Sequence, residues 1–118
     1  MYAKLLVGTM LAVALALTGA TAVRSEPTSL STTVVKVKAK DFVFVLSRKS
    51  APHGKVKFVI TNPSPAVHDF AIAGHKSKPV QPGKSTTLVV TLTKGRHPYK
   101  CTVDSHARLG MKGVFVAK

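Results

Sequence analysis

Three soft donor side chains lie close together near the end of the chain, in the segment CTVDSHARLGM. Four residues separate Cys101 from His106, and four more separate His106 from Met111. A thiolate sulfur, an imidazole nitrogen and a thioether sulfur select copper over magnesium or calcium, which prefer oxygen donors. Cys101 is also the only cysteine. It cannot form an internal disulfide, so we expect it to be buried, metal-bound or reactive.

His68 is the candidate for the second imidazole that a trigonal copper site needs. Two histidines, one cysteine and a weak axial methionine form the donor set associated with electron-transfer copper. His68 shares a face of one predicted strand with Phe70 and Ile72, and Tyr99 shares a face of another with Cys101. Both donors can therefore point inward at the same end of a sandwich. The other histidines lie near turns or polar stretches and are predicted to be surface residues: His53, His75 and His97.

Each donor taken alone has a plainer interpretation. A single histidine on an apolar strand is usually a hydrogen-bonded core residue, and a single cysteine is often an inert small hydrophobe. A methionine before a strand usually fills the core. The four occur together and in order between predicted strands, and this combination favours a metal site.

Alternation of apolar and polar residues with a period of two predicts strands through most of the chain. The pattern places Phe42, Phe44 and Leu46 on one face of their strand, and it covers the residue ranges 34–40, 41–46, 55–61, 86–93 and 113–118. Most runs have one apolar and one wetter side, which is typical of antiparallel sheets. Proline- and glycine-rich turns separate the runs, so we expect an all-β sandwich or barrel. One short helical turn over residues 105–109 is compatible with this pattern.

The N-terminal residues resemble an export signal. Lys4 precedes an apolar run over residues 5–17, and Ala20 and Ala22 form an A-x-A cleavage pattern. We expect a signal peptide over 1–22, a flexible lead-in over 23–32 and one domain over 33–118. The protein would then be exported, to the periplasm or the outside. The alternative is an uncleaved membrane anchor, because 19 uncharged residues from Leu5 to Val23 could just span a bilayer.

The charge balance is strongly basic. The chain has 18 Lys and Arg against 4 Asp and Glu, a formal net charge of +14. Such a charge attracts polyanions, but an exported protein rarely meets nucleic acid, which we therefore exclude. An acidic protein partner fits better, with an anionic membrane surface as the alternative. The plainer interpretation of most lysines is that they solvate the outer faces of strands.

The sequence resembles the cupredoxins, especially small bacterial proteins of the plastocyanin and azurin type. The resemblance covers residues 33–118 and rests on KVKFVITNPSPAVHDFAIAG, QPGKSTTLVVTLTKGRHPYKC and CTVDSHARLGMKGVFVAK. It implies a Greek-key β-sandwich or barrel of about seven to eight strands, with one type 1 copper per chain. The metal would cycle between Cu(II) and Cu(I) to carry single electrons. The ligands that the family implies are His68, Cys101, His106 and Met111.

The resemblance also assigns roles around the metal. Asp69 stands where plastocyanin and azurin commonly have the asparagine that ties the two ligand loops together. The edge of His106 is expected to reach the surface as the electron exit. An apolar docking rim is expected around it, formed by Pro98, Ala107, Leu109 and Gly110. We expect a monomer that is an electron carrier and not an enzyme, with an acidic redox protein as partner.

Three alternatives remain. A periplasmic protein for copper storage or delivery would use open, Met-rich or His-rich sites, and only Met111 is available outside the signal. An enzyme with a Cys–His nucleophilic pair needs an orienting third residue, and none is apparent. A structural sandwich without metal would have no reason to keep all four donors.

Overall fold

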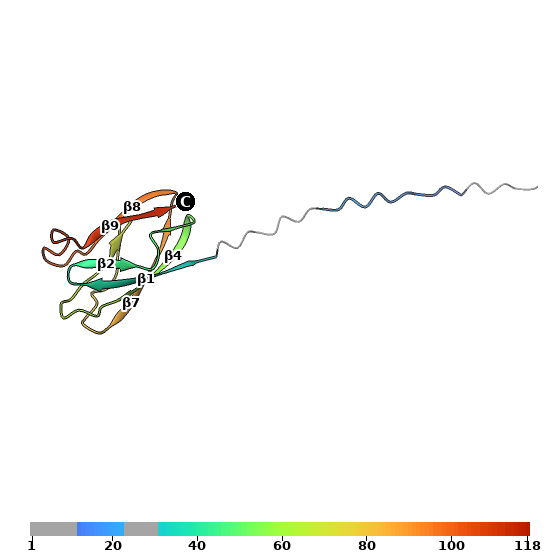
Figure 1. The fold of residues 1–118 in the computed structure, drawn as a ribbon. Coiled ribbons are helices and arrows are strands. Elements are labelled where there is room, and N and C mark those ends of the chain that lie inside the picture. Colours follow the sequence, from blue (N-terminus) through green and yellow to red (C-terminus); the bar gives the residue numbers. More distant parts are fainter. Residues whose placement is uncertain (1–11, 23–30) are drawn as a thin grey trace, which may run out of the picture.

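A computed structural model describes residues 12–22 and 31–118 of the chain. All regular structure in this part is β-sheet (Figure 1). The strands are β1 (Thr33–Lys40), β2 (Val43–Leu46), β3 (Ser50–Ala51), β4 (Gly54–Thr61), β5 (Ala71–Ile72), β6 (His75–Lys76), β7 (Ser85–Leu92), β8 (Gly95–Lys100) and β9 (Lys112–Ala117).

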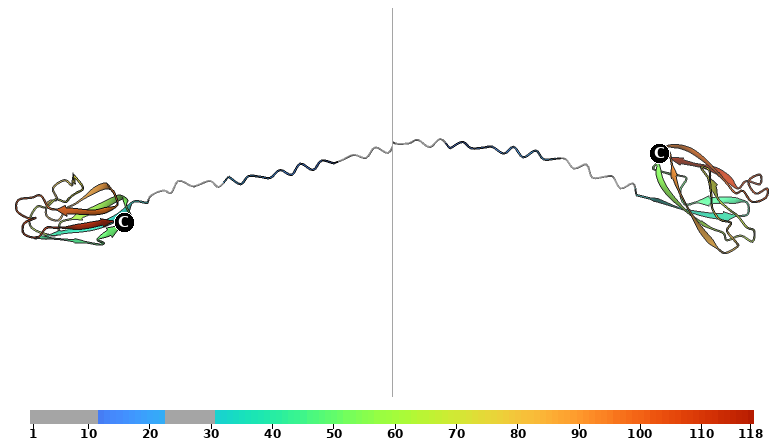
Figure 2. Two further views of the ribbon diagram at one scale, coloured as in Figure 1. Left: turned by 90° about the horizontal axis from the view of Figure 1, so that it is seen from above. Right: turned by 180° about the vertical axis from the view of Figure 1, so that it is seen from behind.

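The strands form two mixed sheets that face each other (Figures 1 and 2). The first has the order β2-β1-β4-β7, with β1 and β4 parallel and the other pairs antiparallel. The second has the order β3-β9-β8-β5-β6, with β3 and β9 parallel. The predicted all-β sandwich is therefore confirmed.

The core lies between the sheets and follows the predicted alternation. Strand β1 buries Val35, Val37 and Ala39 while its lysines stay exposed, and β4 likewise buries every second residue, at 56, 58 and 60. Phe58 packs against both Phe70 and Phe115, at ring-centroid distances of 5.0 and 5.4 Å. Because Phe58 lies on β4 and Phe115 on β9, this aromatic cluster joins the two sheets. Fully burying a side chain of this size contributes about 1.5–3 kcal/mol to stability.

The structure differs from the expected pattern in two details. It has nine strands where about seven to eight were expected, because β3, β5 and β6 have only two residues each. Phe42 does not share the inward face of Phe44: it precedes β2 in a turn and is 37% exposed. The turn at Asp41–Phe42 restarts the alternation at Val43, and sequence periodicity alone does not reveal that break.

The predicted N-terminal segments lie largely outside the described residues. Of the signal peptide, only 12–22 are described; they are exposed and form neither helix nor strand. Of the lead-in, only residues 31 and 32 are described. Within the described part, no helix is long and apolar enough to cross a membrane. The signal, the lead-in and their boundaries stay predictions.

The second sheet brings the donor residues to one end of the sandwich. Strand β8 ends at Lys100 and β9 begins at Lys112, and these two residues pair directly. The intervening loop therefore starts and ends at the same place, with Cys101 and Met111 at its two bases. His68 reaches this end through a single antiparallel bridge to Val80, just before β5.

Candidate metal centre

His68, Cys101 and His106 converge in the interior of the protein. The Nδ1 atoms of the two histidines are 3.1 Å apart, and the Cys101 sulfur lies 3.9 Å from Nδ1 of His68 and 3.7 Å from Nδ1 of His106. His68 and Cys101 are 0% and 1% exposed. The sequence prediction that these three come together is confirmed, and among the described residues they are the group suited to holding a metal ion.

These separations fit a single soft metal ion. Bonds to imidazole nitrogen and thiolate sulfur are about 2.0–2.3 Å long for a first-row ion of this kind, so donors 3.1–3.9 Å apart can all reach one centre. Two imidazoles and a thiolate in a triangle are the donor set of type 1 copper. The residues present therefore fit copper as the cofactor.

His68 is oriented by hydrogen bonds on the side away from the triangle. Its Nε2 lies 2.8 Å from a carboxylate oxygen of Asp41 and 2.9 Å from the hydroxyl of Ser64. Because an ionised carboxylate can only accept, Nε2 carries the proton and Nδ1 keeps a free lone pair. This is the carboxylate–histidine arrangement that fixes metal-binding imidazoles elsewhere. It sets His68 in the tautomer that can bind a metal through Nδ1.

Asn62 holds the segment that leads to His68. Its side-chain amide donates to the carbonyls of Ala66 and Val80 at 2.7 and 2.8 Å, and its oxygen accepts from the backbone and the hydroxyl of Ser64. Asn62 is 0% exposed. Three of its four hydrogen bonds lie within the 62–68 loop, and the fourth connects this loop to Val80, the bridge partner of His68, so this amide helps to position His68.

The ligand loop is held by its own backbone. The amide of Cys101 donates to the carbonyl of Met111, and the amide of Met111 donates to the carbonyl of His106. A helical hydrogen bond from the amide of Leu109 to the carbonyl of Ser105 closes a short turn over 105–109, with which the sequence pattern was compatible. Met111 is 0% exposed, so its side chain lies in the interior, and its backbone is hydrogen-bonded to both other loop donors.

Asp69 links the two parts of the site. The backbone amide and the hydroxyl of Thr102, the residue after Cys101, both donate to its carboxylate. The Asp69 side chain is almost completely buried. The side chain that replaces the family's asparagine thus still ties the His68 segment to the ligand loop.

The Cys101 thiol is held in its neutral form. Burial raises its pKa above the ordinary value, and the negative charge of Asp69 acts in the same direction. Backbone hydrogen bonding from Asp69 and Val103 lowers the pKa of the thiol, each by less than burial raises it. A metal that binds here must therefore displace a proton from Cys101.

His106 is the donor closest to the surface. It is 8% exposed, whereas His68 is fully buried. Phe42 packs on its ring at a centroid distance of 4.9 Å. Leu109 on the same loop is 60% exposed, and Gly110 passes close to the Phe42 carbonyl. Phe42 therefore belongs to the surface around His106.

Pro98 lies apart from the other residues expected around His106. It stands on the outer face of β8, where it lines a groove between β6 and β9. None of the loop residues Ala107, Leu109 and Gly110 lines that groove. The sequence expectation missed this because Pro98 and Cys101 are three residues apart, so an odd number of steps puts them on opposite faces of the strand.

The other predicted surface histidines lie away from the donor triangle. His53 bonds the carbonyl of Lys118, His97 bonds the carbonyl of Thr93, and His75 is exposed on β6. Sequence reasoning missed Asp41 and Ser64. The rarity of acidic residues could have pointed to Asp41. The chain has only 4 Asp and Glu, and two of them contact this site.

Comparisons with known proteins agree with this geometry. The family model of the cupredoxin-like domain matches residues 8–117. The sequence search against curated proteins produced no match. Similar folds occur in solved structures of auracyanins, at TM-scores of 0.63.

Two of these structures show how far the likeness extends. Reduced auracyanin from Roseiflexus castenholzii is 22% identical, over 75% of this chain and 98% of that one. Auracyanin A from Chloroflexus aurantiacus, described as a "blue" copper protein, is 16% identical, over 75% of this chain and all of that one. At these identities the likeness concerns the fold, while the match to the family model spans nearly the whole sequence. The chain belongs to the cupredoxin-like domain family.

Proposed function

We propose that this protein is an exported type 1 copper protein that carries single electrons between redox partners. The observation that carries the proposal is the buried triangle of His68, Cys101 and His106, with donor atoms 3.1–3.9 Å apart. Met111 would be the weak fourth ligand, which its burial and its backbone hydrogen bonds to Cys101 and His106 support. Copper bound there would supply a one-electron Cu(II)/Cu(I) couple.

The residues around the triangle favour electron transfer over other uses of copper. Asp41 and Ser64 fix the His68 ring, and backbone hydrogen bonds fix the loop. Donors that are held in this way cannot rearrange much when the charge at their centre changes. A site that stays still between its two charge states suits fast electron exchange, and the apolar core excludes water from it.

His106 is the proposed electron exit, since its edge reaches the surface. The surrounding surface would be formed by Leu109, Ala107, Gly110 and Phe42. A small apolar contact suits a brief encounter, because transient redox complexes bury little area. The basic charge of the chain would steer an acidic partner toward it.

The burial of the donors argues against copper storage or delivery. All three are at most 8% exposed, whereas a delivery site must let a second protein reach the metal. A hydrolytic role for Cys101 and His106 is also disfavoured. Both side chains are buried, which leaves a substrate little access to them, and burial raises the pKa of the thiol. Export rests on the N-terminal signal pattern alone.

Titration of the purified metal-free protein with Cu(II) tests the proposal. An intense thiolate-to-copper visible band should saturate at one copper per chain, with narrow copper hyperfine splitting in electron paramagnetic resonance. The matched control is Cys101→Ser, which keeps the size of the side chain and should lose the band. A colourless complex, or an ordinary tetragonal copper signal in the wild type, would contradict the proposed electron-carrier function.

A further inference from the structure

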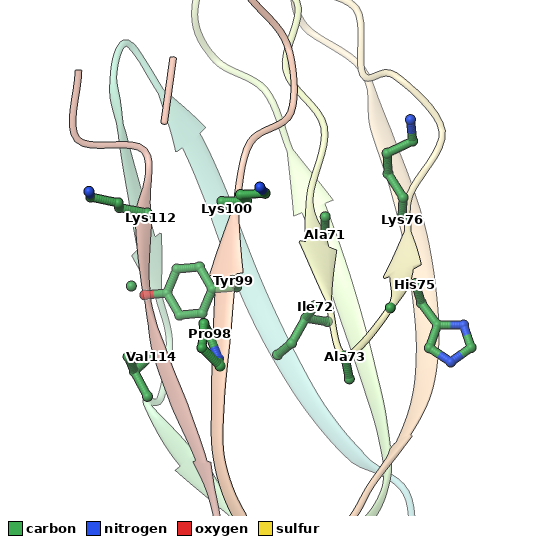
Figure 3. A pocket seen from close by; sticks show the side chains of 12 residues that line it. Ala71, Ile72, Ala73, His75, Lys76, Pro98, Tyr99, Lys100, Lys112 and Val114 are labelled. Carbon is green, nitrogen blue, oxygen red and sulfur yellow. The ribbon is translucent and has the colours of Figure 1, made fainter. Parts of the chain in front are cut away.

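A groove of about 870 Å³ crosses the outer face of the second sheet, away from the core (Figure 3). Strands β5, β6, β8 and β9 contribute its lining. Ala71, Ala73, Pro98 and Val114 present small apolar side chains along it, and three lysines stand along one edge (Figure 3). A concave apolar surface rimmed by like charges is a common form of interaction site.

The strand register places these lysines in one row. Ala71 pairs with Lys76 on one side and with Lys100 on the other, and Lys100 pairs with Lys112. Neighbouring strands are about 4.8 Å apart, so the row extends across roughly 14 Å. Two residues further along the strands, Pro98 pairs with Val114 beside Ala73 in the apolar floor. Charge and apolar surface therefore lie in adjacent stripes.

The lysine row is electrostatically unbalanced. Like charges directly opposite each other on antiparallel strands are destabilising, yet Lys100 faces Lys112. In the other paired strands of the described chain, every lysine faces an uncharged residue, such as Lys36 opposite Val59 and Lys57 opposite Val89. No acidic side chain lines the groove. An anionic occupant would relieve this repulsion.

We infer that the groove is the docking site for an acidic surface of the protein partner. Carboxylates of the partner would lie on Lys76, Lys100 and Lys112, and its apolar side chains would lie on the floor formed with Pro98 and Val114. A row of this length contacts several carboxylates at once, which suits a protein surface better than one small anion. The inference rests on the proposed function for the existence of a redox partner. Lys100 and Lys112 directly adjoin Cys101 and Met111, so a bound partner lies next to the ligand loop.

The test uses a synthetic peptide rich in glutamate and leucine, with a glutamine-for-glutamate peptide as the neutral control. Binding to the full chain is measured by calorimetry and mapped by amide chemical shifts. The variant Lys76→Gln/Lys100→Gln/Lys112→Gln is compared with Lys36→Gln/Lys38→Gln/Lys55→Gln, which removes the same charge from the exposed side of the first sheet. This pair separates a local site from attraction by the net charge.

Docking at the groove predicts that the row variant binds the acidic peptide about tenfold more weakly, a change of about 1.4 kcal/mol. The control variant should change binding by less than about twofold. The amides of residues 71–76, 98–100 and 112–114 should shift in the wild type. Equal weakening in both variants would overturn the inference, as would shifts confined to the first sheet. A row-dependent response to dioleoylphosphatidylglycerol vesicles without one to the peptide would also overturn it, in favour of a membrane.

The same binding experiment on metal-free protein tests the docking site independently of the electron-carrier function. The groove contains none of the copper ligands. The weakening of peptide binding in the row variant (the row effect) should therefore be the same with and without copper. A normal row effect with a failed copper titration would refute the electron carrier and keep the docking surface. A normal copper titration with no row effect would refute the docking surface alone. The variant Val114→Thr, which has nearly the same volume, should weaken binding through the floor without changing charge.

Discussion

The two parts of the metal site are held in different ways. The His68 part depends on side chains that are distant in sequence: Asp41 and Ser64 bond its ring, and Asn62 holds its loop. The part that contains Cys101, His106 and Met111 depends on backbone hydrogen bonds within eleven consecutive residues. The hydrogen bonds from Thr102 to Asp69 join the two parts directly. The first part is therefore sensitive to single side chains, and the second to the length and path of its loop.

The largest effect is expected from Asn62→Ala in the metal-free protein. It removes four hydrogen bonds from a fully buried amide and leaves the Val80 carbonyl without that donor. Losses of this kind cost about 2–4 kcal/mol of unfolding free energy. Denaturant unfolding measures it, with Ser105→Ala in the exposed part of the ligand loop as the control, expected within about 0.5 kcal/mol. Equal costs in both variants would contradict the contrast between the two parts.

The second prediction concerns the negative charge of Asp69, the residue that links the two parts of the metal site. An ionised Asp69 stabilises Cu(II) relative to Cu(I), so Asp69→Asn should raise the reduction potential. A tenfold change in relative affinity corresponds to about 59 mV for one electron, and we expect a rise of this order. Voltammetry of both proteins measures it. Asparagine can still accept from Thr102, so an unchanged or lower potential in the variant would reject the electrostatic role of Asp69.

A third prediction concerns the pH dependence of the free energy of unfolding that the Cys101 thiol causes. The pKa of the Cys101 thiol is raised in the folded protein. The contribution of this thiol to the free energy of unfolding is therefore fully present below the pKa of the unfolded thiol, about 8.5. It is lost as pH rises through the folded pKa, by at most about 1.4 kcal/mol per pH unit. Denaturant unfolding of metal-free protein should show this loss above pH about 8.5. The control is Cys101→Ser, which should show none of it; parallel pH profiles would contradict the assignment.

The smallest effect is expected from Asp41→Asn. This carboxylate also favours Cu(II), but its side chain is 30% exposed, so solvent screens its charge more than that of buried Asp69. The potential should rise by less than in Asp69→Asn, and the amide oxygen should keep His68 in place. Long-range nitrogen-15 NMR of metal-free protein would check the His68 tautomer. A larger potential shift than that of Asp69→Asn would reverse the predicted order.

The sequence predicted the parts of the molecule that depend on local spacing. The alternation along β1, β4 and β7 and the spacing of Cys101, His106 and Met111 are properties of short segments, so they are visible without a structure. His68 was found because it begins an apolar pattern and matches the family motif. The two-residue strands β3, β5 and β6 are too short to produce any periodicity.

Residues that depend on tertiary contacts were harder to predict. Asp41 and His68 are 27 residues apart, and nothing in either segment specifies their approach at 2.8 Å. Phe42 was predicted to share a strand face with Phe44, yet the turn before β2 places it beside His106. Pro98 was expected at the rim of His106, yet it pairs with Val114 of β9 and lines the groove on the outer face of the second sheet.

The parallel pairing of β3 with β9 has a consequence for folding kinetics. Ser50 pairs with Val116, and the amide of His53 donates to the carbonyl of Lys118, across 65 or more residues of chain. Closing such long loops is slow, so a protein with this topology is expected to fold in milliseconds to seconds, far slower than a helical bundle. Three of the four donor positions lie on the loop between β8 and β9, whereas His68 lies 33 residues before Cys101, so the triangle also needs a long-range contact. Metal uptake should therefore follow folding, and refolding rates should not depend on the copper concentration.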